Sequence, residues 1–158
     1  MGRKLLIVLV VLAVGVGGYL IYRSASNNSS GSSGNVQISD TGMKITSGAK
    51  SMDVQYVADP AKVNYGIGIY PGATVDSSKE SSATAKINDV TITYGTFVTP
   101  STADAVLAFY QKQMGSQALT SSLSDGETTY KVVTIKGKQT PVISIYTESG
   151  QTKFRILK

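Results

Sequence analysis

The chain has 158 residues, of which 41% are hydrophobic, and a formal net charge of +5, and it contains neither Cys nor His. These two absences exclude disulfides, Ser-His-Asp and Cys-His catalytic sites, and zinc, haem or non-haem iron held by imidazole. Carboxylates, Lys, Tyr and Ser are the side chains left for chemistry.

An unbroken apolar run near the N-terminus predicts a membrane anchor. Leu5–Tyr22 reads LLIVLVVLAVGVGGYLIY, with Arg3 and Lys4 before it and Arg23 after it. As a helix this run would be about 27 Å long, close to the ~30 Å thickness of the hydrocarbon core of a bilayer. We therefore expect residues 1–23 to hold the chain in a membrane as a single transmembrane helix.

The charges that flank this run predict its orientation. Two side-chain cations and the terminal amine precede the run, whereas one cation directly follows it. Positive charge stays inside, so we expect a cytoplasmic N-terminus in the cell (inner) membrane and an extracytoplasmic, periplasmic domain. The alternative is a cleaved signal peptide with its cleavage site at Ser24-Ala25-Ser26, but the apolar run is longer than a signal peptide requires, which favours a retained anchor.

A polar segment separates the anchor from the rest of the chain. Residues 24–35 read SASNNSSGSSGN, with no charge and no apolar side chain larger than Ala. This composition cannot bury a core, so we expect a flexible linker with an end-to-end distance of roughly 20 Å. Residues 36–158 have the composition and length of one globular domain.

The first half of this domain has the alternation of apolar and polar residues that is typical of strands. A hairpin is predicted around Asp40-Thr41-Gly42, and a Pro-Gly turn at Pro71-Gly72. The strands predicted in this half are Val36–Ser39, Met43–Thr46, Asp53–Val57, the segment Tyr65–Tyr70, Ala83–Ile87 and Val90–Val98.

One helix is predicted in the domain, from Ser101 or Thr102 to Met114. Ser101-Thr102-Ala103-Asp104 has the form of a capping box, with Asp in place of Glu or Gln, and Gly115 suits the end of a helix. Apolar side chains recur at helical spacing, and we interpret this stripe as the face that packs on the sheet. The stripe consists of Ala103, Val106, Leu107, Tyr110 and Met114.

Four further strands separated by glycine-containing turns follow the helix. This pattern favours antiparallel pairing of neighbours in sequence. The predicted strands are Ala118–Leu123, Thr129–Lys136, Thr140–Thr147 and Thr152–Leu157. The predicted fold class is therefore α+β: an N-terminal transmembrane helix and a flexible linker, then an antiparallel sheet covered by one helix.

Two short motifs resemble a group of small bacterial envelope domains. The chain has Tyr70-Pro71-Gly72-Ala73 at a turn and Phe109-Tyr110 on the predicted helix, and the similarity extends over about residues 65–145. These domains lie behind a membrane anchor or a lipoprotein signal and have no established activity. The resemblance implies an α+β fold and a bacterial envelope location, and it implies no functional residues.

Positive charge is concentrated in the last strands. From Lys131 onward the chain has six cations and one acid, Glu148. One interpretation is a surface for an anionic partner such as lipid headgroups, cell-wall polymers or an acidic protein. The other is protection of an exposed sheet edge by Lys. The residues of the candidate surface are Lys136, Lys138, Lys153, Arg155 and Lys158.

No nucleophile motif, calcium loop or dinucleotide loop is present in the sequence. We therefore predict no catalytic residues, no metal site, no cofactor and no nucleic-acid partner. The predicted function is that of a non-catalytic, membrane-anchored envelope domain that binds a protein or a cell-envelope component, for example as an accessory subunit of a membrane complex. The alternative is an enzyme that acts on envelope polymers through carboxylates, such as Asp53 with Asp59 or Asp76 with Glu80, or through Lys.

Overall fold

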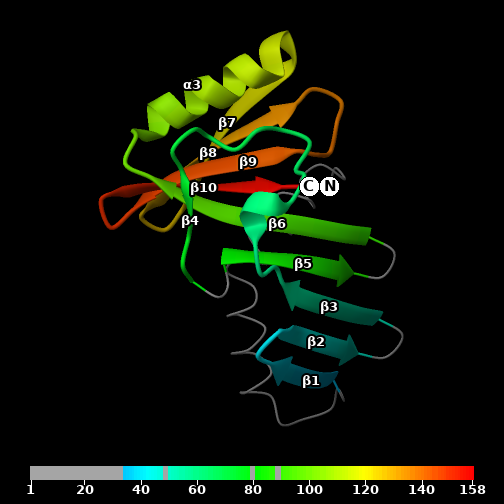
Figure 1. Cartoon of the computed structure of the whole chain (residues 1–158). Coiled ribbons are helices and arrows are strands. Elements are labelled where there is room, and N and C mark those ends of the chain that lie inside the picture. Colours follow the sequence, from blue (N-terminus) through cyan, green and yellow to red (C-terminus); the bar gives the residue numbers. More distant parts are fainter. Residues whose placement is uncertain (1–33, 48–49, 79–80, 88–89) are drawn as a thin grey trace.

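The computed structural model of the chain describes residues 34–47, 50–78, 81–87 and 90–158 (Figure 1). The strands are β1 (Gly34–Ser39), β2 (Gly42–Ser47), β3 (Lys50–Tyr56), β4 (Thr74–Val75), β5 (Ser82–Ile87), β6 (Val90–Thr99), β7 (Ala118–Asp125), β8 (Thr128–Ile135), β9 (Val142–Glu148) and β10 (Gln151–Leu157). The helices are α3 (Ala103–Met114) and the 3-10 turns η2 (Pro60–Lys62) and η4 (Gly115–Gln117).

All ten strands form one antiparallel sheet. Its order is β1-β2-β3-β5-β6-β10-β9-β8-β7, and the two-residue β4 pairs with β6 beside the end of β5. Most strands pair with their neighbours in sequence, as the glycine turns predict, and the chain crosses over once, where α3 carries it from β6 to β7. The predicted α+β class with an antiparallel sheet and one helix is thus confirmed.

α3 has the ends that the sequence predicts, shifted at the start by one residue. Thr102 is the N-cap, and its Oγ1 accepts a hydrogen bond from the Ala105 N–H at 3.2 Å. The predicted capping box would have used Ser101 with Asp104, and this detail is wrong because Asp104 instead forms an ion pair with Lys131. Gly115 ends the helix with a positive φ of 60°.

The segment between β3 and β4 differs from its prediction. The sequence predicts a strand at Tyr65–Tyr70, but the structure has no regular strand there. The side chain of Asn64 accepts a hydrogen bond from the Gly66 N–H, and Gly66 has a φ of +74°, which bends the chain. The predicted turn at Pro71-Gly72 is present, closed by a hydrogen bond from the Ala73 N–H to the Tyr70 carbonyl.

The two faces of the sheet are both apolar over its middle strands, and they differ in what covers them. On the helix face, α3 and the segment 60–75 pack against side chains of β6, β8, β9 and β10 (Figure 1). The predicted helix stripe faces this core, with Val106, Tyr110 and Met114 buried and Ala103 and Leu107 half-buried. On the opposite face, here called the back face, a second cluster extends across seven strands.

The predicted anchor at residues 1–23 lies outside the described residues, as does the predicted linker up to residue 33. Within the described part of the chain, which starts at residue 34, no helix is long and apolar enough to cross a membrane. The membrane assignment therefore stays a prediction from sequence.

Candidate functional site

The fold divides the five predicted surface cations into two groups: three lie at one end of the sheet, and two lie within the strand β10 (Gln151–Leu157). Lys136 and Lys138 lie in the turn between β8 and β9, on either side of Gly137, and Lys158 follows β10. Because Leu157 pairs with Val142 at the start of β9, Lys158 lies at the same end of the sheet as this turn. Lys153 is five residues before Lys158, about 17 Å away along an extended strand.

The three cations at this end of the sheet form a group, here called the terminal lysines. Lys136, Lys138 and Lys158 are all exposed. Lys158 donates from its ammonium to the Asn64 carbonyl at 2.8 Å, so this side chain is held toward the segment between β3 and β4. None of the ion pairs found among the described residues includes a terminal lysine. Their charge is therefore presented to solvent.

Lys153 is instead enclosed by two carboxylates. Its Nζ lies 2.8 Å from Asp76 Oδ2 and 2.6 Å from Glu148 Oε2. Its side chain is 19% exposed and that of Asp76 is 11% exposed. Asp76 directly follows β4, and its backbone N–H donates to the Thr96 carbonyl of β6, which fixes the position of the carboxylate. Lys153 is therefore a structural ion-pair partner, and its charge is neutralised within the domain.

Arg155 is also held within the domain, on the back face. Its Nε donates to Thr96 Oγ1 at 3.0 Å, and its guanidinium carbon lies 4.8 Å from the centre of the Tyr94 ring. Such a cation–π contact is favourable where the side chains are partly shielded from water, as these are. Arg155 thus covers an aromatic ring, and neither Arg155 nor Lys153 projects freely from the sheet.

The alternative interpretation of these cations as guards of a sheet edge is wrong. β10 lies in the interior of the sheet, between β6 and β9. The edges of the described sheet are β1 and β7. Sequence order misleads here, because the last strand of the chain returns to pair with β6.

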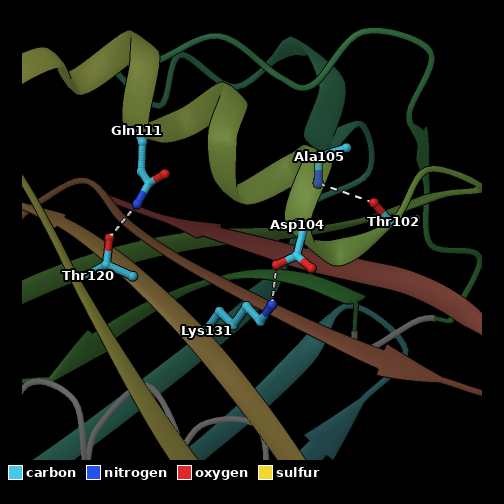
Figure 2. A network of polar contacts seen from close by, with 6 residues as sticks. All are labelled: Thr102, Asp104, Ala105, Gln111, Thr120 and Lys131. Carbon is cyan, nitrogen blue, oxygen red and sulfur yellow. Dashed lines mark hydrogen bonds and ion pairs between the residues drawn. The ribbon is translucent and has the colours of Figure 1, made fainter.

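The helix is fixed over the sheet by polar contacts at both ends (Figure 2). Lys131 of β8 forms an ion pair with Asp104 in the first turn of α3. Gln111 of α3 donates to Thr120 Oγ1 of β7 at 3.0 Å. Both contacts lie on the helix face. Lys131 is the first cation of the basic C-terminal region, and its charge is paired with Asp104 within the domain.

The carboxylates considered for catalysis are dispersed. Asp53 lies on β3 opposite Lys44 of β2, whereas Asp59 pairs with Lys62 at 2.9 Å. Asp76 is bound to Lys153, and Glu80 lies outside the described residues. In the part of the chain that the structure describes, no three acidic side chains gather in a way that could hold a metal ion.

An open groove on β1–β3 was not anticipated from the sequence. It has a volume of about 450 Å³. Polar side chains of the three strands contribute to it, together with the β1–β2 turn, and they include Gln37, Ser39, Lys44, Asp53 and Gln55. All but Asp53 are exposed, and Asp53 is half-buried. The groove is open and lined mainly by exposed polar side chains, and strand alternation alone cannot reveal it.

Two phenols are buried in the helix-face core. Burial raises the pKa of Tyr65 to about 12 and raises that of Tyr110 further, although the nearby Tyr70 backbone opposes the second shift. Neither hydroxyl has a hydrogen-bond partner of acceptable geometry. Both phenols are therefore neutral at physiological pH and serve packing.

The comparisons with known proteins identify no relative. No family model matches the chain, and no curated protein or solved structure shows significant similarity to it. The resemblance to envelope domains stays a prediction, and the function has to be argued from this chain's own residues.

The ion pair of Asp76 predicts a loss of stability in acid. Burial alone would raise the pKa of Asp76, but bonds from the Lys153 ammonium and the Ser78 amide hold that pKa below its ordinary value of 3.8. A lowered pKa adds stability that is complete above pH 3.8 and is lost as the pH falls through the lower folded-state value. The urea midpoint should therefore be steady from pH 7 to about 5 and fall below about 4.

The Asp76→Asn variant is the control for this prediction. It should already have a lower urea midpoint than the wild type at pH 7, because Lys153 loses one of its two carboxylates. Its midpoint should then fall less in acid. An equal acid dependence in wild type and variant would show that other carboxylates cause the loss.

Proposed function

We propose that this protein is a non-catalytic, membrane-anchored envelope domain that binds an anionic cell-envelope component through its terminal lysines. In this proposal Leu5–Tyr22 is the anchor, and residues 24–33 are the main part of the tether that places the domain near the outer surface of the membrane. The partner is an acidic protein, an anionic lipid headgroup or an anionic cell-wall polymer, which share a negative charge.

The observation that carries the proposal is the exposure of the terminal lysines at one end of the sheet. Three ammonium groups, from the β8–β9 turn and the end of β10, face solvent without a carboxylate partner among the described residues. Cations near an anionic surface contribute about 1 kcal/mol each, within a Debye length of ~8–10 Å. Such a group is suited to weak, salt-sensitive binding.

The carboxylates support a binding role over the enzymatic alternative. Asp59, Asp76 and Asp104 each pair with a Lys, so their charges are used in the fold. A general acid or base requires a carboxylate or an amine within reach of a substrate. The alternative of an enzyme acting on envelope polymers has no specific observation in its favour.

The test is a binding comparison with the full-length chain reconstituted into nanodiscs of zwitterionic lipid. The triple variant K136Q/K138Q/K158Q should lose at least tenfold in affinity for vesicles containing anionic lipid or for purified anionic cell-wall polymer. Raising the salt concentration should weaken wild-type binding and have little effect on the variant. The separate lipid and polymer arms identify the source of the negative charge.

A matched control removes the same amount of charge elsewhere. The triple variant K44Q/K86Q/K112Q replaces exposed lysines of β2, β5 and α3. It should retain most of the wild-type affinity. Equal losses in the two triple variants would mean that only net charge matters, and unchanged binding in the terminal-lysine variant would refute the proposed site.

A further inference from the structure

The edge strand β7 lacks the features that usually prevent one sheet from pairing with another. It is the longer of the two edges of the described sheet, with eight residues against six in β1. Each residue of β7 pairs with one residue of β8, so the strand has no bulge. The stretch Ala118–Ser124 reads ALTSSLS and includes no charged residue and no Pro. Soluble proteins normally protect such an edge with Lys, with Pro or with a bulge.

The side chains of β7 are open to solvent over most of its length. Leu119 is 50% exposed, and among the large apolar side chains of the described residues only Val90 is comparable. Alternate residues of an edge strand direct their backbone N–H and C=O groups away from the neighbouring strand. β7 therefore offers both backbone groups and an apolar side chain to a further strand. Its other exposed residues are Thr120, Ser121, Ser122 and Ser124.

The residue order makes β7 complementary to itself. When two copies of the strand run antiparallel with Ser121 opposite Ser121, Leu119 of each copy lies opposite Leu123 of the other, and Thr120 lies opposite Ser122. The two members of each pair are an even number of positions apart, so their backbone groups point to the same side of the strand, as an antiparallel ladder requires. The same edge can thus serve both copies.

The pairing of β7 with β8 shows which face the leucines occupy. Ser121 pairs with Val132, and Leu123 pairs with Tyr130, and both of these β8 residues belong to the back-face cluster. Leu119 lies on the same face by alternation. A two-fold axis normal to the sheet leaves the back faces of the two copies on one side. The leucines that lie opposite each other therefore also share a face, and such cross-strand apolar pairs are stabilising.

We propose that β7 is a self-association edge, at which two copies of this chain pair β7 with β7 in antiparallel register centred on Ser121. The sheet then continues from one copy into the other, and Leu119 is covered. The assembly closes at two copies because both use the same edge. A pair of short strands is a small interface, so the dimer is weak and reversible. This inference goes beyond the proposed binding to anionic partners and uses none of the terminal lysines.

The absence of native Cys allows the register to be tested by disulfide formation. In the proposed dimer the two copies of residue 121 have Cα atoms about 4.5–5.5 Å apart, within the range of a disulfide. The full-length variant S121C in detergent micelles should therefore form a covalent dimer under mild oxidation. S124C is the matched control, because residue 124 lies opposite residue 118 and is about 20 Å from its own counterpart. S121C should give at least fivefold more dimer than S124C.

A charge on the edge provides a second test. Adding L119K to S121C places an ammonium group on the pairing strand and should lower the yield of covalent dimer at least fivefold. Adding V90K instead replaces the other highly exposed apolar side chain, which lies on the interior strand β6, and should leave the yield unchanged. Near-ultraviolet circular dichroism checks that both variants remain folded.

Three outcomes would overturn the proposal. Equal yields from S121C and S124C would show collision, or association through residues 1–33, without the proposed register. Equal effects of L119K and V90K would show that the edge is not the contact. A mixture of S121C with Q37C of β1 that yields more mixed than S121C dimer would show pairing of unlike edges, which builds open chains. The substitutions K136Q/K138Q/K158Q should leave the S121C dimer intact, so the two proposals fail separately.

Discussion

Phe154→Ala should cost about 3–5 kcal/mol of the free energy of unfolding, the largest effect we expect from a single substitution in this domain. Phe154 lies on the central strand β10 and is completely buried. Its ring stacks on Phe97 at 5.4 Å between centroids and contacts Tyr110 of α3 at 5.7 Å and Tyr70 at 6.3 Å. One side chain therefore joins β6, the helix and the loop segment.

Urea unfolding of the full-length chain in detergent, followed by near-ultraviolet circular dichroism, measures this cost. The chain has nine Tyr and no Trp, so the signal reports on the tyrosines, of which Tyr65 and Tyr110 lie in this core. Phe154→Leu, which keeps much of the apolar volume, should cost clearly less. If Phe154→Ala cost under 1 kcal/mol, the helix face would not be the main core of the domain.

Local sequence patterns predicted the strands, the turns and the helix because each is specified by neighbouring residues. The hairpin at Asp40-Thr41 and the meander after α3 follow from alternation interrupted by turn residues. The helix register follows from its apolar stripe and its cap. The strand predicted at Tyr65–Tyr70 is the exception. There the Gly66 N–H donates to the nearby Asn64 side chain and the Gly68 N–H donates to the Gln113 side chain of α3, and these bonds override the local β propensity.

The placement of the cations could not be predicted from sequence. Lys153 and Arg155 alternate with apolar residues along the last strand. This alternation correctly predicted that both cations lie on the face opposite the helix core. It could not show that Asp76, which is 77 positions before Lys153 in the sequence, would meet its ammonium, or that β10 would lie inside the sheet. Such partners depend on the strand order, which is set by long-range pairing.

The middle strands of the sheet bury side chains on both faces, although α3 covers the helix face alone. β10 alternates Phe154 and Ile156 on the helix face with Arg155 and Leu157 on the back face, and Ile156 and Leu157 are both buried. On the helix face this burial comes from α3 and the segment 60–75, whereas on the back face longer side chains of the sheet lie over their neighbours, for example Arg155 over the Tyr94 ring.

Gly95→Ala should destabilise the domain by about 1–3 kcal/mol or more, because there is no space for the methyl group that the alanine adds. A Cβ at this position of β6 would lie 2.1 Å from the Tyr65 hydroxyl oxygen, 3.0 Å from Tyr65 Cζ and 3.1 Å from Pro60 Cβ. Tyr65 is 2% exposed, and its ring packs edge-on against Phe97. The segment 60–75 would have to lift from the sheet to admit the methyl group.

Tyr65→Phe should rescue part of this loss. The Tyr65 hydroxyl is buried without a hydrogen-bond partner, so its removal alone should be neutral or stabilising. In the Gly95→Ala background it also removes the closest of the three contacts, leaving the milder ones at 3.0 and 3.1 Å. A double-mutant cycle on urea unfolding should therefore give a favourable coupling of at least about 0.5 kcal/mol. Strict additivity would show that Gly95 is required for β6 itself and that the loop does not pack on it as closely as the structure indicates.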